Sequence, residues 1–389
     1  MVKRSNRIFT TLGAIVLGIA LVALIVFAGD KTRGPLENLF TSMSDMVRKI
    51  EKHFILQKRE GIRKGKLAWF TAYKSNLDSL KHPKTILLGA FDNNTTESFA
   101  SIIDLEDTLK TSFPLIHLFT AWGSKPEQEF PKEQVEAILA CGSLPVITWE
   151  PWLTDFDAGD YPHLRKKEQR DKGGLADVAQ GDYDTYISTW AKEVKSVQEP
   201  VFLRIGHEMN DPYRYPWGPH NNSAEDFIDA WKHIFHLFDS IGARNVIWIW
   251  SPHPAHGFYE AFYPGDEFVD YVGVTALNYG VVANWSKWWT FQEIAGNYYQ
   301  ELAAFNKPLM ITEFGSLVVG GNRSEWFGEA LADLPEKYPK VKSILFFHFS
   351  NDNTTTEQSL NWYIIDDTIT TRTIINQLQQ WPDSLKPVN

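Results

Sequence analysis

Two glutamates that follow short apolar segments have the residue type and the setting for paired-carboxylate chemistry. Glu208 lies in Phe202-Leu-Arg-Ile-Gly-His-Glu-Met-Asn210, and Glu313 lies in Lys307-Pro-Leu-Met-Ile-Thr-Glu-Phe-Gly315. An apolar run that is bounded by Pro or Gly and ends abruptly in polar residues is typical of a buried parallel strand. We therefore expect each glutamate at the carboxyl end of a strand, where the strand opens onto a site.

The spacing of apolar segments along the chain predicts the fold that positions these glutamates. Glu208 and Glu313 are 105 residues apart, or three steps of about 35 residues, each long enough for a strand, a helix and a return loop. Eight segments are expected to be strands: 85–90, 115–120, 145–149, 201–205, 246–250, 269–274, 308–312 and 343–347. Between them, helical spacing of apolar residues occurs at 133–139, 183–194, 224–238, 291–305 and 324–334. The alternation predicts an α/β fold, a (β/α)8 TIM barrel.

In such a barrel, the functional site is built at the carboxyl ends of the strands. The residues expected at those ends are Asp92, Trp122, Glu150, Glu208, Ser251, Asn278, Glu313 and His348. Both candidate carboxylates therefore fall on one rim.

The composition fits one large domain and excludes some partners. With 389 residues, 43% of them hydrophobic, the chain can bury a large core, and we assign the barrel to residues 84–389. A net charge of −10 argues against a nucleic-acid partner, because binding phosphates requires a basic face. We expect no cofactor and no metal site, since His207-Glu208 lacks the second histidine of a His-Glu-x-x-His zinc motif.

Ahead of the barrel, residues 8–28 are almost wholly apolar and carry no charge. About 20 such residues can span a bilayer. We expect residues 1–29 to form a short cytoplasmic tail and a single transmembrane helix, with the barrel outside the cytoplasm. A cleaved signal peptide, which would leave the protein secreted, is the alternative, although the apolar region exceeds the usual ~7–15 residues.

Residues 30–83 are expected to form a juxtamembrane helical spacer. An amphipathic stripe over residues 36–58 is followed by a basic run that includes Arg59, Arg63 and Lys66. The spacer could pack on the barrel or be solvated. Alternatively, the apolar face and the basic run could lie on a membrane surface or engage a partner.

Cleavage of a glycosidic bond is a reaction that needs two carboxyl groups in different ionisation states. One protonates the leaving group, while the other stabilises or attacks the oxocarbenium-like sugar. Burial and mutual repulsion can hold the two pKa values apart. One glutamate at a strand end is more often a rim or ion-pair residue, but two at matching barrel positions favour the catalytic interpretation.

The segment around Glu208 is the most specific motif. It reads His207-Glu208-Met209-Asn210, with Arg204 upstream, whereas related barrels usually have Asn before this Glu. The other motifs are Trp149-Glu-Pro-Trp152, Tyr215-Pro-Trp-Gly218, Asn245-Val-Ile-Trp-Ile-Trp-Ser-Pro252, Tyr263-Pro-Gly-Asp-Glu-Phe-Val-Asp-Tyr-Val-Gly273 and the Glu313 segment. In type and order, these motifs resemble glycoside hydrolase family 26, which is best known for β-mannanases.

The resemblance implies a retaining β-glycoside hydrolase with Glu208 as acid/base and Glu313 as nucleophile. It implies a β-linked polysaccharide as substrate, with β-1,4-mannan the commonest in the family and mixed-linkage β-glucan and β-1,3-xylan as alternatives. In a retaining mechanism, the two carboxyl groups lie ~5–5.5 Å apart.

Further residues on the expected rim could bind the sugar. An indole offers a flat apolar face to a pyranose ring and an N–H to a hydroxyl group. Trp217, nine residues after Glu208, is the strongest candidate of this kind. The full set of expected substrate-binding residues is His207, Arg204, Trp217, Tyr279, Trp152, Glu150 and Trp122.

Two departures from the family pattern leave a second interpretation open. Leu277 stands where the family commonly has a Tyr that contacts the nucleophile, and Tyr279 could supply that hydroxyl group from one step higher. The eighth strand reads Phe346-Phe-His-Phe349, where the family often has a Trp beneath the sugar. The alternative function is a catalytically silent glycan-binding barrel, accessory to polysaccharide synthesis or export machinery.

Overall fold

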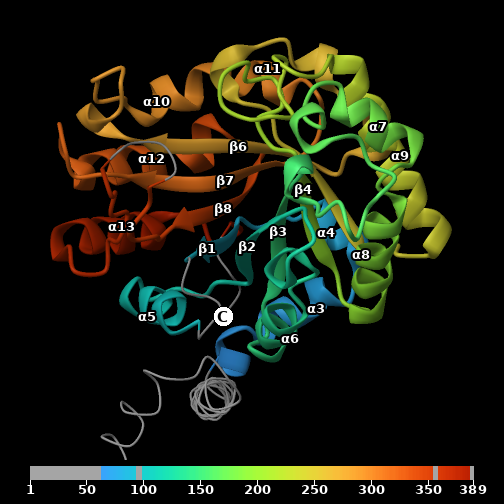
Figure 1. Ribbon diagram of the computed structural model, residues 1–389. Coiled ribbons are helices and arrows are strands. Elements are labelled where there is room, and N and C mark those ends of the chain that lie inside the picture. Colours follow the sequence, from blue (N-terminus) through green and yellow to red (C-terminus); the bar gives the residue numbers. More distant parts are fainter. Residues whose placement is uncertain (1–62, 93–98, 354–357, 386–389) are drawn as a thin grey trace, which may run out of the picture. The chain divides into compact units, whose positions relative to one another are not determined.

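Eight parallel strands close into a barrel in the computed structural model, which describes residues 63–92, 99–353 and 358–385 (Figure 1). Each strand pairs with the next in sequence, and β1 pairs with β8. The strands are β1 (Leu87–Phe91), β2 (Leu115–Ala121), β3 (Leu144–Glu150), β4 (Val201–Ile205), β5 (Val246–Trp250), β6 (Tyr271–Asn278), β7 (Leu309–Ser316) and β8 (Val341–Phe347). The predicted (β/α)8 barrel is confirmed.

Strands β6 and β7 extend beyond their predicted ends. The prediction ended the seventh strand at residue 312, but β7 continues to Ser316, so Glu313 lies within the strand. The pairing of β6 with β7 shifts between Val274 and Thr275, which marks a bulge. Polar side chains are accommodated here because alternate residues point into the mouth of the barrel. The polar residues Thr312 and Glu313 therefore lie within β7 and do not mark its end.

Helices surround the barrel in the order that the sequence predicts (Figure 1). They include α5 (Ala100–Thr108), α6 (Lys132–Ala140), α7 (Gly174–Gln180), α8 (Asp184–Val197), α9 (Ala224–Ile241), α12 (Arg323–Lys337) and α13 (Thr368–Gln380). Local signals fix α9: Ser223 and Asp226 form a capping box at its start, and Gly242, with φ +84°, ends it.

The single helix expected over residues 291–305 is wrong. The chain instead forms α10 (Phe291–Ile294), the 3₁₀ turn η10 (Gly296–Tyr298) and α11 (Tyr299–Ala303). Gly296 and Asn297 are both poor helix formers and fall in the middle of the segment, which explains the interruption.

Residues 63–83, expected in the helical spacer, pack against the amino-terminal end of the barrel. They form the 3₁₀ turn η1 (Ala68–Phe70) and helices α3 (Thr71–Lys74) and α4 (Leu77–Lys81). Leu67, Phe70 and Leu80 are buried in one cluster with side chains from the strands, and thus close the bottom of the barrel.

Arg63, one of the residues of the basic run, is buried rather than exposed. Its guanidinium donates to both carboxylate oxygens of Glu106 on α5, at 3.2 and 2.6 Å, and to the carbonyl oxygens of Cys141 and Phe113. Cys141 is itself buried. These bonds join the segment before η1 to the outer layer of the barrel.

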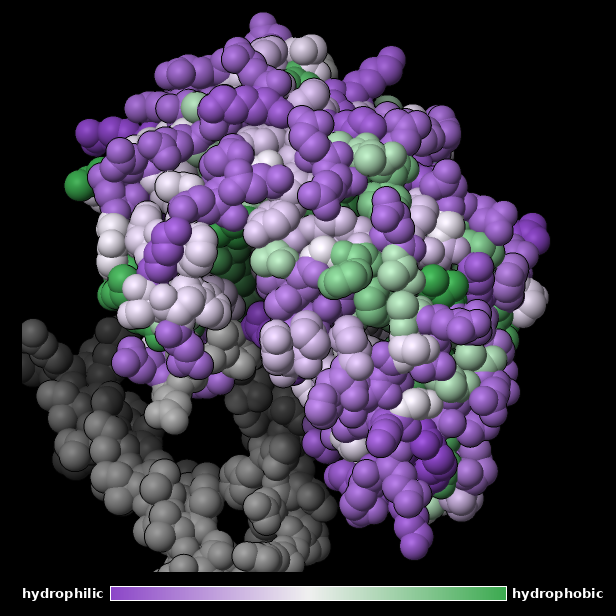
Figure 2. Space-filling model, turned by 90° about the horizontal axis from the view of Figure 1, so that it is seen from above, coloured by the Kyte–Doolittle hydropathy of each residue, from purple (hydrophilic) through white to green (hydrophobic). Residues whose placement is uncertain are grey.

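The expected membrane segment, residues 8–28, and the amphipathic stripe over residues 36–58 lie outside the described residues. Within the three described ranges, no helix combines the length and the apolar character needed to cross a bilayer. The face shown in Figure 2 is mostly hydrophilic, with small, separate hydrophobic patches.

Candidate active site

Arg204 on β4 organises the centre of the site from inside the barrel. It is fully buried, as its position on the inward face of the strand predicts. Its guanidinium donates to Glu313 Oε1 at 2.6 Å and to the hydroxyl groups of Thr148 and Thr312 at 2.7 and 2.5 Å. Arg204 therefore ties β3, β4 and β7 together and supports the carboxylate of Glu313 from below.

Glu208 sits in a turn directly after β4, in an unusual backbone conformation. Its φ is +55°, in the left-handed region that non-glycine residues rarely adopt, and its N–H donates to the carbonyl of Ser251 at 2.7 Å. Such strain persists where the surrounding structure determines it, often at functional sites. The turn brings the buried Glu208 side chain onto the rim beside β5.

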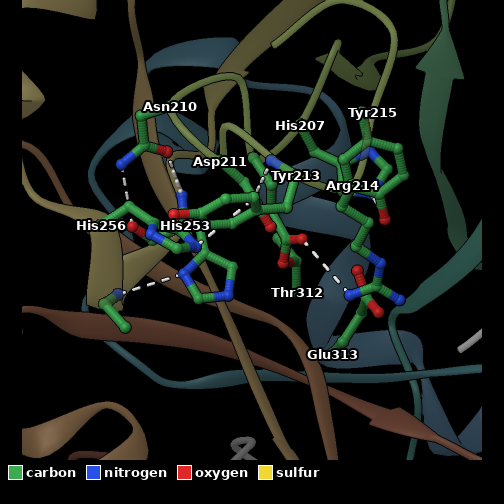
Figure 3. Close-up of polar contacts among 12 residues, drawn as sticks. His207, Asn210, Asp211, Tyr213, Arg214, Tyr215, His253, His256, Thr312 and Glu313 are labelled. Carbon is green, nitrogen blue, oxygen red and sulfur yellow. Dashed lines mark hydrogen bonds and ion pairs between the residues drawn. The ribbon is translucent and has the colours of Figure 1, made fainter. Parts of the chain in front are cut away.

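Arg214, in the loop after β4, is close to both glutamates, and Figure 3 shows it beside Glu313. Its Nη1 is 3.6 Å from Glu208 Oε2, and in the close-up its guanidinium group lies beside Glu313. Nothing in the sequence singled out Arg214, since a basic residue in a polar loop is ordinary. It is the main site residue that the sequence analysis missed.

Burial and neighbouring charges set the pKa of Glu313. Burial raises it, Arg204 lowers it, and repulsion from Glu208 raises it, so that the pKa of Glu313 lies above its ordinary value. The charged hydrogen bond from Arg204 is the strongest local force that favours the ionised form. The effect of the Glu208 charge on Glu313 is consistent with the two side chains lying close together at the mouth of the barrel.

The pKa of Glu208 depends on His253. Burial raises the pKa of Glu208, but the charges of His253 and Arg214, a hydrogen bond from Thr275 and the charge of Arg204 together lower it below its ordinary value. Burial lowers the pKa of His253, the charge of Glu208 raises it, and burial prevails, which favours the uncharged imidazole. The uncharged form of His253 opposes protonation of Glu208 less than the charged form does.

Removing the charge of Arg204 should move the acidic limb of the pH profile of kcat/KM to higher pH. Arg204 lowers the pKa of Glu313, so Arg204→Gln raises that pKa. If Glu313 must be ionised to react, activity is then lost earlier as pH falls. Arg323→Gln, which breaks an ion pair with Asp367 away from the site, is the matched control and should leave the limb in place. An unmoved limb in Arg204→Gln would contradict the role of Glu313.

His207 belongs to a chain of polar and aromatic contacts along one wall. Its Nε2 lies 2.9 Å from the hydroxyl of Tyr215, and its Nδ1 lies 3.9 Å from Glu150 Oε1. The indole of Trp152 donates to Glu150 Oε2 at 3.0 Å. Burial raises the pKa of Glu150, whereas the bond from Trp152 and the charge of Arg204 lower it; burial prevails.

Two of the tryptophans expected to bind sugar are buried instead. Trp217 is 2% exposed, stacks on Tyr215 at 4.5 Å and donates to the carbonyl of His207 at 2.8 Å. Trp122 is fully buried against Trp149. Both residues follow the carboxyl ends of strands, as predicted. Their rings, however, are packed between the strands and the helices, so they support the wall of the site and do not face the substrate.

Tyr279 was expected to supply the hydroxyl group that contacts Glu313 in place of the missing Tyr at position 277, but its hydrogen bond is to Arg214. Its ring packs edge-on against Trp362 at 5.0 Å. Leu277 is packed in the same apolar cluster as Tyr279 and Trp362. The structure thus brings together Glu208, Glu313, Arg204, Glu150 and His207, and adds Tyr279 through Arg214.

An eight-stranded parallel barrel with two buried glutamates at its mouth is an arrangement typical of glycoside hydrolases. The family model of glycosyl hydrolase family 26 matches residues 145–365, more than half of the chain. The chain belongs to this family.

Individual relatives agree with that assignment. The chain is 30% identical over 276 residues to endoglucanase H of Acetivibrio thermocellus, a match that covers 69% of this chain and 28% of that protein. It is 29% identical over 174 residues to a mannan endo-1,4-β-mannosidase of Bacillus subtilis, covering 43% of each. In both cases, the match spans less than half of the relative. Among solved structures, GH26C from Muricauda sp. MAR_2010_75 shares the fold, with a TM-score of 0.56, 18% identity, and coverage of 79% of this chain and 90% of that chain.

Proposed function

We propose that this protein is a retaining β-glycanase, which hydrolyses a β-linked polysaccharide by double displacement. The observation that carries the proposal is the pairing of two buried glutamates, Glu208 in the turn after β4 and Glu313 within β7, the second of them hydrogen-bonded by Arg204. Membership of glycosyl hydrolase family 26 supports the same reaction class.

In the first step, the carboxylate of Glu313 attacks the anomeric carbon, and Glu208 gives its proton to the departing glycosidic oxygen. In the second step, Glu208 takes a proton from a water molecule, which displaces Glu313 from the sugar. Each displacement inverts the anomeric carbon, so the product keeps the configuration of the substrate.

The contacts of the two glutamates fit these roles. The hydrogen bond from Arg204 to Glu313 Oε1 stabilises a carboxylate, as a nucleophile requires. In contrast, no described residue donates a hydrogen bond to the buried Oε2 of Glu208, whose cationic neighbour Arg214 lies 3.6 Å away, so this oxygen is free to turn toward a leaving group.

We propose β-1,4-mannan as the substrate, with mixed-linkage β-glucan and β-1,3-xylan as the other candidates. The similarity to the mannan endo-1,4-β-mannosidase of Bacillus subtilis supports mannan. The similarity to endoglucanase H supports a glucan as an alternative substrate. The purified full-length chain should release oligosaccharides from one of these polymers and from no α-linked polymer.

Proton NMR of the first-formed product should then show the β anomer before mutarotation. An initial α anomer would establish inversion and would imply carboxyl groups ~6.5–9.5 Å apart, with room for a water molecule. Binding of a polymer without product from any of them would instead favour the glycan-binding alternative.

We further propose that residues 8–28 anchor the enzyme to a membrane with the barrel outside the cytoplasm, beside polysaccharide synthesis or export machinery. The uncharged apolar run supports the anchor. The protein should stay in the membrane fraction after a carbonate wash, and protease added to intact cells should digest the barrel. Amino-terminal sequencing that begins near Gly29 would contradict the anchor and indicate secretion.

A further inference from the structure

A group of potential metal ligands lies beside Glu208, on the loops that follow β4 and β5. It consists of Asp211, three residues after Glu208, and of His253 and His256 (Figure 3). The three side chains each offer one donor atom, and these atoms lie within 4.8 Å of one another. Across residues 63–92, 99–353 and 358–385, no other group of three or more such side chains comes this close.

The spacing of Asp211 and His256 fits two ligands of one ion better than a hydrogen bond. His256 Nε2 lies 3.4 Å from Asp211 Oδ1. In a tetrahedral zinc site with bonds of ~2.0–2.1 Å, two donors lie roughly 3.3–3.4 Å apart. A charge-assisted hydrogen bond is shorter, and the chain provides an example, since His233 Nε2 lies 2.6 Å from Asp184 Oδ1.

The two loops are held in place independently of any ion. The buried side chain of Asn210 donates to the carbonyls of His253 and Gly257 at 3.0 and 2.8 Å, and accepts from the N–H of His253 at 2.6 Å. The N–H of Tyr213 donates to Asp211 Oδ1 at 2.8 Å and fixes the carboxylate. The donor set is therefore largely preorganised, which lowers the entropic cost of binding.

The three side chains also leave an open coordination position. Asp211 is buried, but the two imidazoles are partly exposed, so solvent reaches the group from one side. Besides the bond from Tyr213 to Asp211, a long hydrogen bond of 3.2 Å runs from the N–H of Ala255 to His253 Nδ1. An ion bound through Nδ1 of His253 would replace this bond.

We propose that Asp211, His253 and His256 bind one zinc ion on the rim of the active site, where it would join the loops after β4 and β5. Two imidazoles and a carboxylate suit zinc, whereas calcium and magnesium prefer oxygen ligands alone. Neither Glu208 nor Glu313 is among the ligands, so the ion would not bind the two catalytic carboxylates directly.

Calorimetric titration of the chelator-treated full-length chain with zinc chloride tests the proposal. Wild type should bind one zinc ion per chain at this site, and His256→Ala should weaken that binding by at least about 100-fold, the upper end of the loss for removing even an outer-shell partner. Asp211→Asn should also weaken it, while its amide oxygen still accepts the N–H of Tyr213. His233→Ala, which removes a His–Asp pair without a third ligand, should bind zinc as wild type does.

Cobalt(II) provides a second readout. In wild type it should give the intense visible absorption of a four-coordinate ion, and in His256→Ala this absorption should be lost. Zinc binding that is unchanged in His256→Ala and Asp211→Asn would overturn the proposal, because the ion would then bind elsewhere. An absence of zinc binding to wild type would also overturn it and would leave Asp211 and His256 as a loop-closing ion pair.

Discussion

Glu313→Gln should lower kcat for polysaccharide hydrolysis by at least about 10⁴-fold, which corresponds to roughly 5.4 kcal/mol of lost transition-state stabilisation. An amide cannot attack the anomeric carbon, so no glycosyl-enzyme can form. The amide oxygen can still accept the hydrogen bond from Arg204 that Glu313 Oε1 accepts at 2.6 Å, so the fold should be preserved. Initial rates on the preferred polymer, with thermal unfolding as a check on the fold, measure the effect.

The assignment of Glu313 as the nucleophile can also be tested by changing the leaving group of the substrate. An aryl glycoside with a good leaving group should not rescue Glu313→Gln, because attack on the sugar is still missing. Glu150→Gln is the matched variant, since Glu150 is a third carboxyl group on the same rim, and it should keep far more activity. The assignment fails if Glu313→Gln turns over near the wild-type rate while Glu150→Gln does not.

Glu208→Gln should slow the two steps of the reaction to different extents, depending on the leaving group of the substrate. On a polysaccharide, loss of the proton donor should cost about 10²–10⁴-fold in rate. On an aryl glycoside with a good leaving group, the first step needs no proton and should remain fast, whereas hydrolysis of the glycosyl-enzyme needs the base and should be slow. Stopped-flow release of the phenol should therefore show a burst of one equivalent per active site, followed by slow turnover.

Azide supplies the complementary test of Glu208. As a nucleophile that needs no base, azide should restore the second step in Glu208→Gln and yield a β-glycosyl azide. Wild type should give almost none of this product. If neither the burst nor the azide adduct forms, Glu208 does not act as the acid/base.

The barrel could be predicted because each strand is marked by a short, local run of apolar residues. Apolar runs such as 201–205 and 246–250 coincide with β4 and β5, since interior parallel strands are apolar on both faces. The proposed catalytic pair came from the same signal, because each glutamate interrupts or follows such a run. The end of β7 was missed because barrel strands carry polar residues at their mouth, where composition no longer separates strand from loop.

The rest of the site depends on contacts that sequence spacing does not encode. Trp217 and Trp122 are near the rim in sequence, but the direction of each ring follows from packing against Tyr215 and Trp149. Arg214 and His253 come from irregular loops after different strands. Only the closed barrel brings these loops together, and no periodic pattern marks the residues that will face inward.

The buried bond between Arg63 and Glu106 has a practical consequence for producing the enzyme without its amino-terminal segment. A fragment that starts at the first residue of the expected barrel domain, Lys84, lacks Arg63, Leu67, Phe70 and Leu80. It would leave the buried Glu106 without its cationic partner, although the N–H of Phe113 still donates to it, at a cost of up to about 3–5 kcal/mol, and would expose the apolar floor of the barrel. A soluble fragment for crystallisation or assay should therefore begin upstream of Arg63.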